Sequence, residues 1–216
     1  MGCSNSRNSQ KDQENTLESF EYQLRLHKKH FKQVLPVINQ KAQGPSISEK
    51  ELREILGELR LPVENTVKHF KLVFEEEGLI PKKSVKIASI LLSVASKTEK
   101  SLALFEVIDP NQTYHLSMDE CIQTFTYIAN LSAKQIPKLA QEAFTEDLRK
   151  YLERLEESIP RTIRSLSQEL MKGKGSVSRD YFVGALEKQP LSCLLKPKNL
   201  RKLLYQTSLS GPKPWH

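Results

Sequence analysis

The sequence predicts an all-α protein, and three observations support this fold class. Apolar residues recur at helical spacing along most of the chain, so that they share one face of successive helices. Glycine, proline and capping residues interrupt these stretches at intervals typical of helix ends. Alternating runs of β-branched residues, which would favour strands, are few.

The first half of the chain is predicted to be a series of amphipathic helices. Asn15 is a candidate cap, and apolar residues at helical spacing follow it from Leu17 to Ile38. Ser48 and Glu51 have the spacing of a capping box, ahead of a helix that continues to Leu59. Further helices are predicted at 67–74, 85–94 and 98–108, with breaks at Gly44-Pro45, Pro62, Gly78 and Pro81.

The second half repeats these signals. Ser117 and Glu120 form another capping box after the turn Asp109-Pro110-Asn111. A helix opened by Ser132 is expected to reach Ala143, and a long charged helix to run from Thr145 to Ser158. Pro160 separates that helix from the apolar face 163–170, Ser178 caps the next helix, and a last short helix is predicted at 197–205.

Four of the breaks share one pattern, which indicates an internal repeat. Each offers a small or turn-adapted residue, then an apolar residue, and in three cases a serine cap. Each lies between two amphipathic helices, so the chain is predicted to contain four helix–loop–helix units. The breaks are Gly44 with Ile47 and Ser48, Gly78 with Ile80, Tyr114 with Leu116 and Ser117, and Gly175 with Val177 and Ser178.

These units resemble the EF-hand family, whose calcium loop has 12 positions with ligands at 1, 3, 5, 7 and 12. Residues 109–120 match that loop best. The resemblance implies that an apolar residue at position 8, here Leu116, pairs with the partner loop. It also implies one calcium site at most, with the following ligands in loop order: Asp109, Asn111, Thr113, His115 through its carbonyl, and Glu120.

The third loop also departs from the family pattern. Tyr114 stands at position 6, where the family has glycine, and a bulky residue at positive φ costs about 1 kcal/mol. Ser117 and Glu120 are equally well explained as a helix cap. The other loops carry lysines at ligand positions, such as Lys41, Lys172 and Lys174. We expect those loops to keep their shape without metal.

The first six residues, Met1-Gly2-Cys3-Ser4-Asn5-Ser6, fit the pattern of N-terminal acylation. Removal of Met1 would leave Gly2 as the acceptor of a myristoyl chain. One myristoyl chain anchors a protein only marginally, and the Cys3 thiol is where a palmitoyl chain would supply the second signal. The alternatives are an unmodified polar tail and a free surface thiol. Acylation predicts a peripheral protein at the cytoplasmic face of a membrane.

A lipid start followed by four such units resembles the calcium-sensor group that includes neuronal calcium sensors and calcineurin-B-like proteins. The resemblance implies two lobes of paired units. The last gap between loop starts, from Asp109 to Leu170, is 61 residues, so an extra helix is expected in the C-terminal lobe. The predicted parts are a flexible lipid-anchored N-terminus at 1–14, an EF-hand-like pair at 15–96, a second pair with the inserted helix at 97–190, and a short helix with a tail at 191–216.

Composition limits the remaining possibilities. The formal net charge is +7, but basic residues are mixed with acidic ones and no basic, aromatic-interleaved strand suggests a nucleic-acid partner. The longest apolar run, 87–95, is too short to cross a bilayer. The chain opens without a secretory signal pattern, and its three cysteines are too widely spaced for a disulfide framework or a zinc site. Both features fit a reducing cytosol.

The sequence leaves three classes of function to compare. The first is a lipid-anchored regulator, similar to calcium sensors, that binds an amphipathic helix, a channel or a kinase in an apolar groove. The second is a membrane-tethered adaptor whose units work without metal. An enzyme is the third, and it is disfavoured because the sequence has no phosphate-binding glycine loop, no nucleophile elbow and no supported Cys/His pairing.

Overall fold

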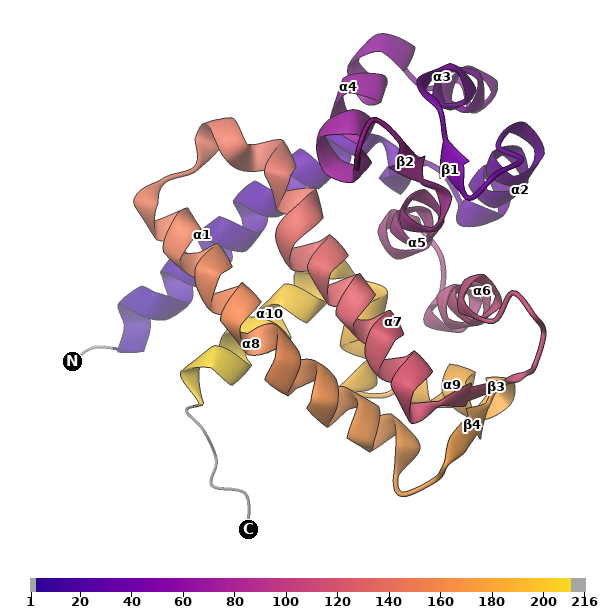
Figure 1. Ribbon diagram of the computed structural model, residues 1–216. Coiled ribbons are helices and arrows are strands. Elements are labelled where there is room, and N and C mark those ends of the chain that lie inside the picture. The colour runs from indigo at the N-terminus through magenta and orange to yellow at the C-terminus, as the bar shows by residue number, and fades with distance from the viewer. Residues whose placement is uncertain (1–2, 211–216) are drawn as a thin grey trace.

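The computed structural model describes residues 3–210, with side chains from Gln10 onward. It confirms the all-α class (Figure 1), since short strands are the only other regular elements in this range. The α-helices are α1 (Cys3–Glu21), α2 (Phe31–Lys41), α3 (Glu49–Glu58), α4 (Val63–Phe74), α5 (Lys82–Leu92), α6 (Lys97–Ile108), α7 (Met118–Asn130), α8 (Glu146–Met171), α9 (Arg179–Leu186) and α10 (Pro197–Leu209). Shorter helical segments are η1 (Tyr22–Leu24), η2 (Leu26–Lys28), η3 (Leu131–Gln135), η4 (Ile136–Ala143) and η5 (Leu191–Leu195).

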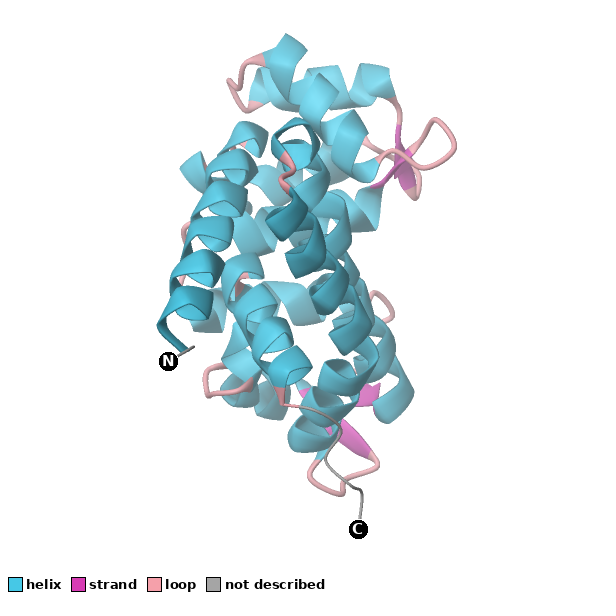
Figure 2. Ribbon diagram, turned by 90° about the vertical axis from the view of Figure 1, so that its left-hand side faces the viewer, coloured by secondary structure: helices cyan, strands magenta, loops and turns pink. Residues whose placement is uncertain are grey.

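Four short strands join the helix–loop–helix units in pairs. β1 (Ser46–Ile47) pairs antiparallel with β2 (Ile80–Pro81), and Ile47 stands opposite Ile80. β3 (His115–Ser117) pairs antiparallel with β4 (Ser176–Ser178), and Leu116 stands opposite Val177. All four apolar residues are buried. The expected contact of Leu116 with the partner loop is therefore confirmed, and both views place the two strand pairs at separate ends of the molecule (Figures 1 and 2).

The helices of both pairs share one hydrophobic core. Within the first pair, α2 packs on α5 and α3 on α4, and within the second, α6 packs on α9 and α7 on α8. The contact of α5 with α6 joins the pairs, and α10 covers α8. One continuous cluster of buried apolar side chains extends from Leu17 to Tyr205. The two predicted lobes are thus not separate cores in the described part of the chain.

The N-terminal region differs from its predicted boundaries. The tether expected at 1–14 is helical from Cys3 on, and the side chain of Glu14 is fully buried. The apolar stretch expected to form one helix up to Ile38 is divided, because Arg25 adopts a left-handed backbone with φ of 60° between η1 and η2. Leu24 and Leu26, on either side of Arg25, are both buried, so this bend brings two neighbouring leucines into the core.

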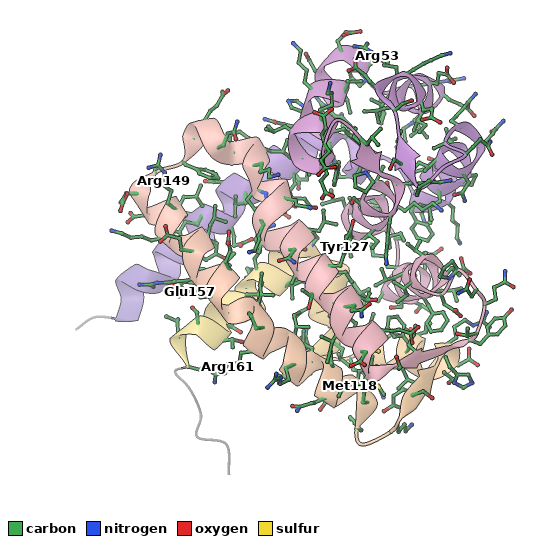
Figure 3. All side chains as sticks on the ribbon, in the orientation of Figure 1. Arg53, Met118, Tyr127, Arg149, Glu157 and Arg161 are labelled. Carbon is green, nitrogen blue, oxygen red and sulfur yellow. The ribbon has the colours of Figure 1, made fainter. Side chains whose placement is uncertain are left out.

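The predicted inserted helix at 145–158 is not a separate element. It is the first half of α8, a helix of 26 residues that continues through Pro160. Pro160 is exposed, while Leu155, Ile159 and Ile163 are buried and keep one apolar face along the helix. The helix predicted from Ser132 to Ala143 is replaced by η3 and η4, and Ser132 is buried rather than acting as a cap. The outward side of α8 carries exposed charges such as Arg149 and Glu157 (Figure 3).

Side-chain interactions link the first pair to the second. Tyr127 of α7, labelled in Figure 3, shares a hydrogen bond between hydroxyls with Ser84 of α5. Glu99 forms a capping box with Ser96 at the start of α6, and its Oε1 accepts a hydrogen bond of 2.7 Å from Nζ of Lys32 in α2. The hydrogen bond from Lys32, together with those from Ser96, lowers the pKa of Glu99 from 4.5 to about 2.

We expect this carboxylate to make stability depend on acid pH. Because the folded state lowers the pKa of Glu99, its contribution is complete above pH 4.5 and is lost as pH falls toward about 2. At pH 7, Glu99→Gln should therefore unfold at a lower urea concentration than the parent chain. This difference in stability should shrink as the pH falls from 4.5 toward about 2. Urea unfolding followed by circular dichroism measures it, with Glu157→Gln as the exposed control. A difference that stays constant down to pH 2 would contradict this role.

Candidate functional site

The best-matching loop spans Asp109 to Glu120, between the end of α6 and the first turn of α7. α6 ends because Asp109 leaves the helical conformation, and its backbone N–H closes the last turn on the carbonyl of Phe105 at 2.9 Å. α7 begins after Ser117, which caps it. Leu116 is held by its pairing with Val177. Core packing, the cap and the strand pair therefore fix both ends of the loop.

Asp109 organises the loop from its first position. The residue is 8% exposed. Its Oδ1 accepts hydrogen bonds from the backbone N–H and the hydroxyl of Thr113, both at 2.9 Å, and its Oδ2 accepts one from the N–H of Tyr114 at 2.7 Å. Burial acts to raise the pKa of Asp109, but these hydrogen bonds outweigh it, so the pKa is lowered. The carboxylate is thus held ionised without a metal ion.

Three predicted ligand oxygens converge in the loop. Oγ1 of Thr113 lies 2.9 Å from Oδ1 of Asp109 and 3.0 Å from the carbonyl oxygen of His115. Both distances are those of hydrogen bonds that the Thr113 hydroxyl donates, so the oxygens at positions 1, 5 and 7 are close together and bonded to one another.

The remaining predicted ligands are not gathered with them. Oε2 of Glu120 accepts hydrogen bonds from the N–H of Ser117 at 2.8 Å and from its hydroxyl at 2.7 Å, which completes the capping box. Those bonds lower the pKa of Glu120, against the repulsion from Asp109. Asn111 is exposed. No group of three or more His, Cys, Asp or Glu side chains among the described side chains, from Gln10 to Ser210, is arranged to hold a metal ion.

Tyr114 adopts a left-handed backbone conformation that glycine takes more readily. Its φ is 58°, and that of Gln112 is 55°, so two non-glycine residues of the loop are left-handed. Arg179, next to β4, donates its N–H to the carbonyl of Tyr114 at 3.1 Å and lies over the tyrosine ring, with the guanidinium carbon 5.7 Å from the ring centre. The guanidinium of Arg179, which also pairs with Asp180 at 3.6 Å, therefore lies beside the loop.

The other loops are held by other means, although the loop at Gly78 does carry carboxylates, of which Glu75 pairs with Lys71 at 3.4 Å. Gly78 has a φ of 80°, as the glycine position requires. In the last loop the left-handed residues are Lys172 and Gly173 rather than Gly175, because α8 ends at Met171 with Lys172 as its cap. Nζ of Lys174 lies 3.6 Å from the ring centre of Tyr181, the residue at position 12. The ammonium group of Lys174 therefore supplies a positive charge within this loop.

The predicted lipidation residues lie at the edge of the described chain. Gly2 is outside the described residues. Cys3 is the first residue of α1, and its side chain is not described. α1 itself is firmly held further on, because Leu17 is buried in the core and α1 packs on η4.

A buried ionic cluster, which the sequence analysis missed, fixes α1 to the C-terminal helix. Arg201 of α10 is fully buried; its guanidinium donates to both oxygens of Glu14, at 3.0 to 3.2 Å, and to the carbonyl of Ser132 at 3.1 Å. Nη1 also lies 2.7 Å from Oε1 of Glu21. The Tyr151 hydroxyl of α8 donates to Glu14 at 2.6 Å. Residues of α1, η3, α8 and α10 are therefore joined in one cluster around the guanidinium.

Charge within the cluster is set by burial and pairing together. Burial raises the pKa of Glu21, although Arg201 acts to lower it. Burial acts to lower the pKa of Arg201, but Glu21 and Glu14 outweigh it and the pKa is raised. Burial and Glu14 raise the pKa of Tyr151. A sequence signal did exist: Glu14, Leu17, Glu21 and Leu24 share one helical face, so two carboxylates lie in an apolar stripe.

No protein-family model, curated protein or solved structure matches this chain. Among the described residues, no helix combines the length and the apolar content that crossing a bilayer requires.

Proposed function

We propose that this chain is a regulatory protein anchored by N-myristoylation of Gly2, together with palmitoylation of Cys3, at the cytoplasmic face of a membrane. There it binds a protein partner, such as an amphipathic helix, a channel or a kinase, and it performs no catalysis. The observation that carries the EF-hand-like part is the pairing of Ile47 with Ile80 and of Leu116 with Val177. These are equivalent positions of four helix–loop–helix units. The anchoring part rests on the acylation pattern of the first six residues.

Calcium enters the proposal at one loop at most. The convergence of oxygens from Asp109, Thr113 and His115 supports a site there. Glu120 would complete it by giving up its bonds to Ser117. Only two side chains of the set carry a full negative charge, and affinity rises with ligand charge. A bound ion would draw the first turn of α7 toward the loop.

A metal-independent adaptor is the second candidate, and the hydrogen bonds of the loop favour it. Asp109 is satisfied by three donors and Glu120 by the capping box, so the loop closes without an ion. Arg179 and Lys174 add positive charge at this end of the molecule. In this form the units serve as a scaffold, and calcium changes nothing.

Calorimetric titration of the purified, non-acylated chain with calcium, in the presence of magnesium, distinguishes the two candidates. Binding at a single site with a micromolar dissociation constant would support a calcium-dependent regulator. Absence of heat up to millimolar calcium would support the adaptor. Two or more sites would contradict both, because neither candidate assigns an ion to any loop but the third.

Glu120→Gln should remove any calcium response of the chain. The substitution takes one of the two negative charges from the site, whereas the amide oxygen still caps α7, so the free energy of unfolding should fall by less than about 1 kcal/mol. Calorimetry and urea unfolding of this variant measure the two effects. The control is Glu51→Gln, which alters the corresponding capping box at Ser48 without touching the third loop. A calcium response that survives Glu120→Gln would place the ion elsewhere.

A further inference from the structure

A basic turn follows α1 at the end opposite the acylation pattern. Residues 25–32, Arg-Leu-His-Lys-Lys-His-Phe-Lys, contain no acidic residue. The left-handed backbone of Arg25 and the burial of Leu24 and Leu26 leave Arg25 and Lys28 exposed at the surface. The pKa of His27 is lowered, first by burial and then by the positive charges of Lys28 and Arg25. Several cations are thus concentrated at one bend of the chain.

Three cations of this turn are not neutralised by the described part of the protein. Within residues 3–210, the ion pairs of the turn are those of His30 and Lys32 with Glu99. Arg25, Lys28 and Lys29 have no carboxylate within ion-pair distance there. Lys196 and Lys198, which lie near α1, are instead paired with Glu18 at 3.3 Å and 2.6 Å. The basic turn therefore keeps three cations for an external partner.

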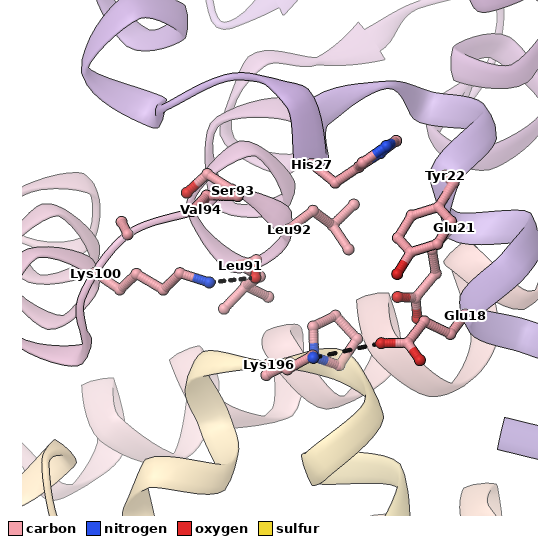
Figure 4. A pocket seen from close by; sticks show the side chains of 12 residues that line it. Glu18, Glu21, Tyr22, His27, Leu91, Leu92, Ser93, Val94, Lys100 and Lys196 are labelled. Atoms are coloured by element: carbon pink, nitrogen blue, oxygen red, sulfur yellow. Dashed lines mark hydrogen bonds and ion pairs between the residues drawn. The ribbon is translucent and has the colours of Figure 1, made fainter. Parts of the chain in front are cut away.

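Exposed apolar side chains lie beside the turn. Tyr22 is 46% exposed, and its ring stacks against His27 with 4.3 Å between the ring centres. Val94, after the end of α5, is 72% exposed. Tyr22, His27 and Val94 line the same hollow (Figure 4). Cations beside an aromatic ring and an aliphatic side chain are the combination that binds membrane interfaces.

The interior of the hollow is not the binding site, because its charges are already satisfied. Nζ of Lys100 donates to the carbonyl of Leu91 at 2.7 Å, and Lys196 pairs with Glu18, as the dashed lines in Figure 4 mark. What remains available is the surface of the basic turn together with Tyr22 and Val94.

We propose that Arg25, Lys28 and Lys29, with Tyr22 and Val94, form a docking surface for a phospholipid membrane that carries anionic headgroups. The phosphates and carboxylates of the headgroups pair with the three cations, and Tyr22 and Val94 contact the interface. The surface acts without an acyl chain, so it goes beyond the lipid anchor. This proposal rests on the proposed function only for the statement that the protein lies at a membrane.

Together with the anchor, this surface sets the orientation of the protein. α1 has 19 residues, and a rise of about 1.5 Å per residue makes it roughly 28 Å long. Acylated residues at one end and the basic turn at the other can touch one membrane only if α1 lies along it. Figure 2 shows α1 along one side of the molecule, where it is free of covering helices on its outward face.

Co-sedimentation of the full-length, non-acylated chain with vesicles tests the surface. The vesicles are phosphatidylcholine alone or phosphatidylcholine with phosphatidylserine, at about millimolar lipid. We expect binding only to the anionic vesicles and its loss at high salt. Each basic residue near an anionic surface contributes roughly fivefold, so the variant Arg25→Gln/Lys28→Gln/Lys29→Gln should bind roughly 100-fold more weakly. Val94→Ser should weaken binding without changing its salt dependence.

The matched control is Arg149→Gln/Arg154→Gln/Arg164→Gln, which removes three exposed charges from α8 and should bind as the parent chain does. Equal weakening in both triple variants would overturn the proposal, because net charge alone would then explain binding. Failure of the parent chain to bind anionic vesicles would also overturn it and would leave the acyl anchor untouched. Binding to a duplex oligonucleotide but not to vesicles would replace the membrane with a nucleic acid and overturn it as well.

Discussion

Arg201→Leu should lower the free energy of unfolding by about 3–5 kcal/mol, the largest stability effect we expect from a single substitution. The guanidinium is fully buried and is the only cation within ion-pair distance of Glu14 and Glu21 among the described residues. Its loss would leave Glu21 without its cation and Glu14 with the Tyr151 hydroxyl but no cation, and breaking a buried ion pair in this way costs about 3–5 kcal/mol. Urea unfolding measures the loss.

Two further variants separate the ionic cluster from general damage to α10. Lys202→Leu changes the next residue, which is exposed, and should stay within about 0.5 kcal/mol of the parent chain. The variant Glu14→Met/Glu21→Met/Arg201→Met removes all three charges together, and we expect it to be more stable than Arg201→Leu, because apolar replacement of a whole buried ionic group is often neutral. Equal stability of Arg201→Leu and Lys202→Leu would mean that the cluster is not formed.

The cluster also determines how firmly the N-terminal helix is attached. Glu14 and Glu21 are the residues of α1 that reach Arg201, while Leu17 between them enters the core. In Arg201→Leu, the amide protons of α1 should exchange with solvent faster than those of α7. Local opening of α1 would then no longer require breaking the bonds of the ionic cluster. Hydrogen exchange read by mass spectrometry detects this difference.

Gly2→Ala should transfer the protein from the membrane fraction to the cytosol. The acyl transfer requires the free amine of an N-terminal glycine, so the variant would lack the myristoyl chain. The basic turn alone supplies too little binding energy to replace it at cellular lipid concentrations, since three cations near the surface contribute about 1 kcal/mol each. Fractionation and fluorescence microscopy of cells that express the tagged chain measure the distribution.

Two further variants test whether acylation itself causes the change in distribution. Asn5→Ala leaves the acylation pattern intact and should remain at the membrane. Cys3→Ser keeps the myristoyl chain alone, which gives marginal and reversible association, so an intermediate distribution is expected. Retention of Gly2→Ala at the membrane would mean that acylation is not the anchor.

Local signals in the sequence were sufficient for many helix ends. The capping boxes at Ser48 and Ser117 form as predicted, since both partners of each box lie within three residues of each other. Gly78 takes the positive φ expected of its loop. The positive φ of Tyr114 was likewise foreseeable from its position in the third loop. Each of these features depends on neighbouring residues alone.

Features that depend on tertiary packing could not be predicted from the sequence. Arg25 is left-handed because burial of Leu24 and Leu26 requires a bend there, and no local signal marks a non-glycine residue for that role. α8 continues through Pro160 because its apolar face stays buried on both sides of the proline. Arg201 looked like one of several solvated basic residues of a short helix. Its burial depends on Glu14 and Glu21, more than 170 residues away in the chain.

The candidate site was likewise predictable only where neighbouring residues determine it. The third loop was identified from residue types, and three of its expected ligands do converge, namely Asp109, Thr113 and the carbonyl of His115. The engagement of Glu120 with Ser117 was foreseen as the competing explanation, and it is the arrangement present in the structure. The nearness of Arg179 could not be foreseen, because it depends on the pairing of β3 with β4.

Intact-mass spectrometry of the chain purified from eukaryotic cells tests membrane anchoring most directly. The prediction is a chain that lacks Met1 and carries the mass of one myristoyl group, located on Gly2 by fragmentation and resistant to hydroxylamine. A second acyl group on Cys3 should be released by hydroxylamine, since it is a thioester. An unmodified Gly2 amine in protein from the membrane fraction would contradict the proposed anchor.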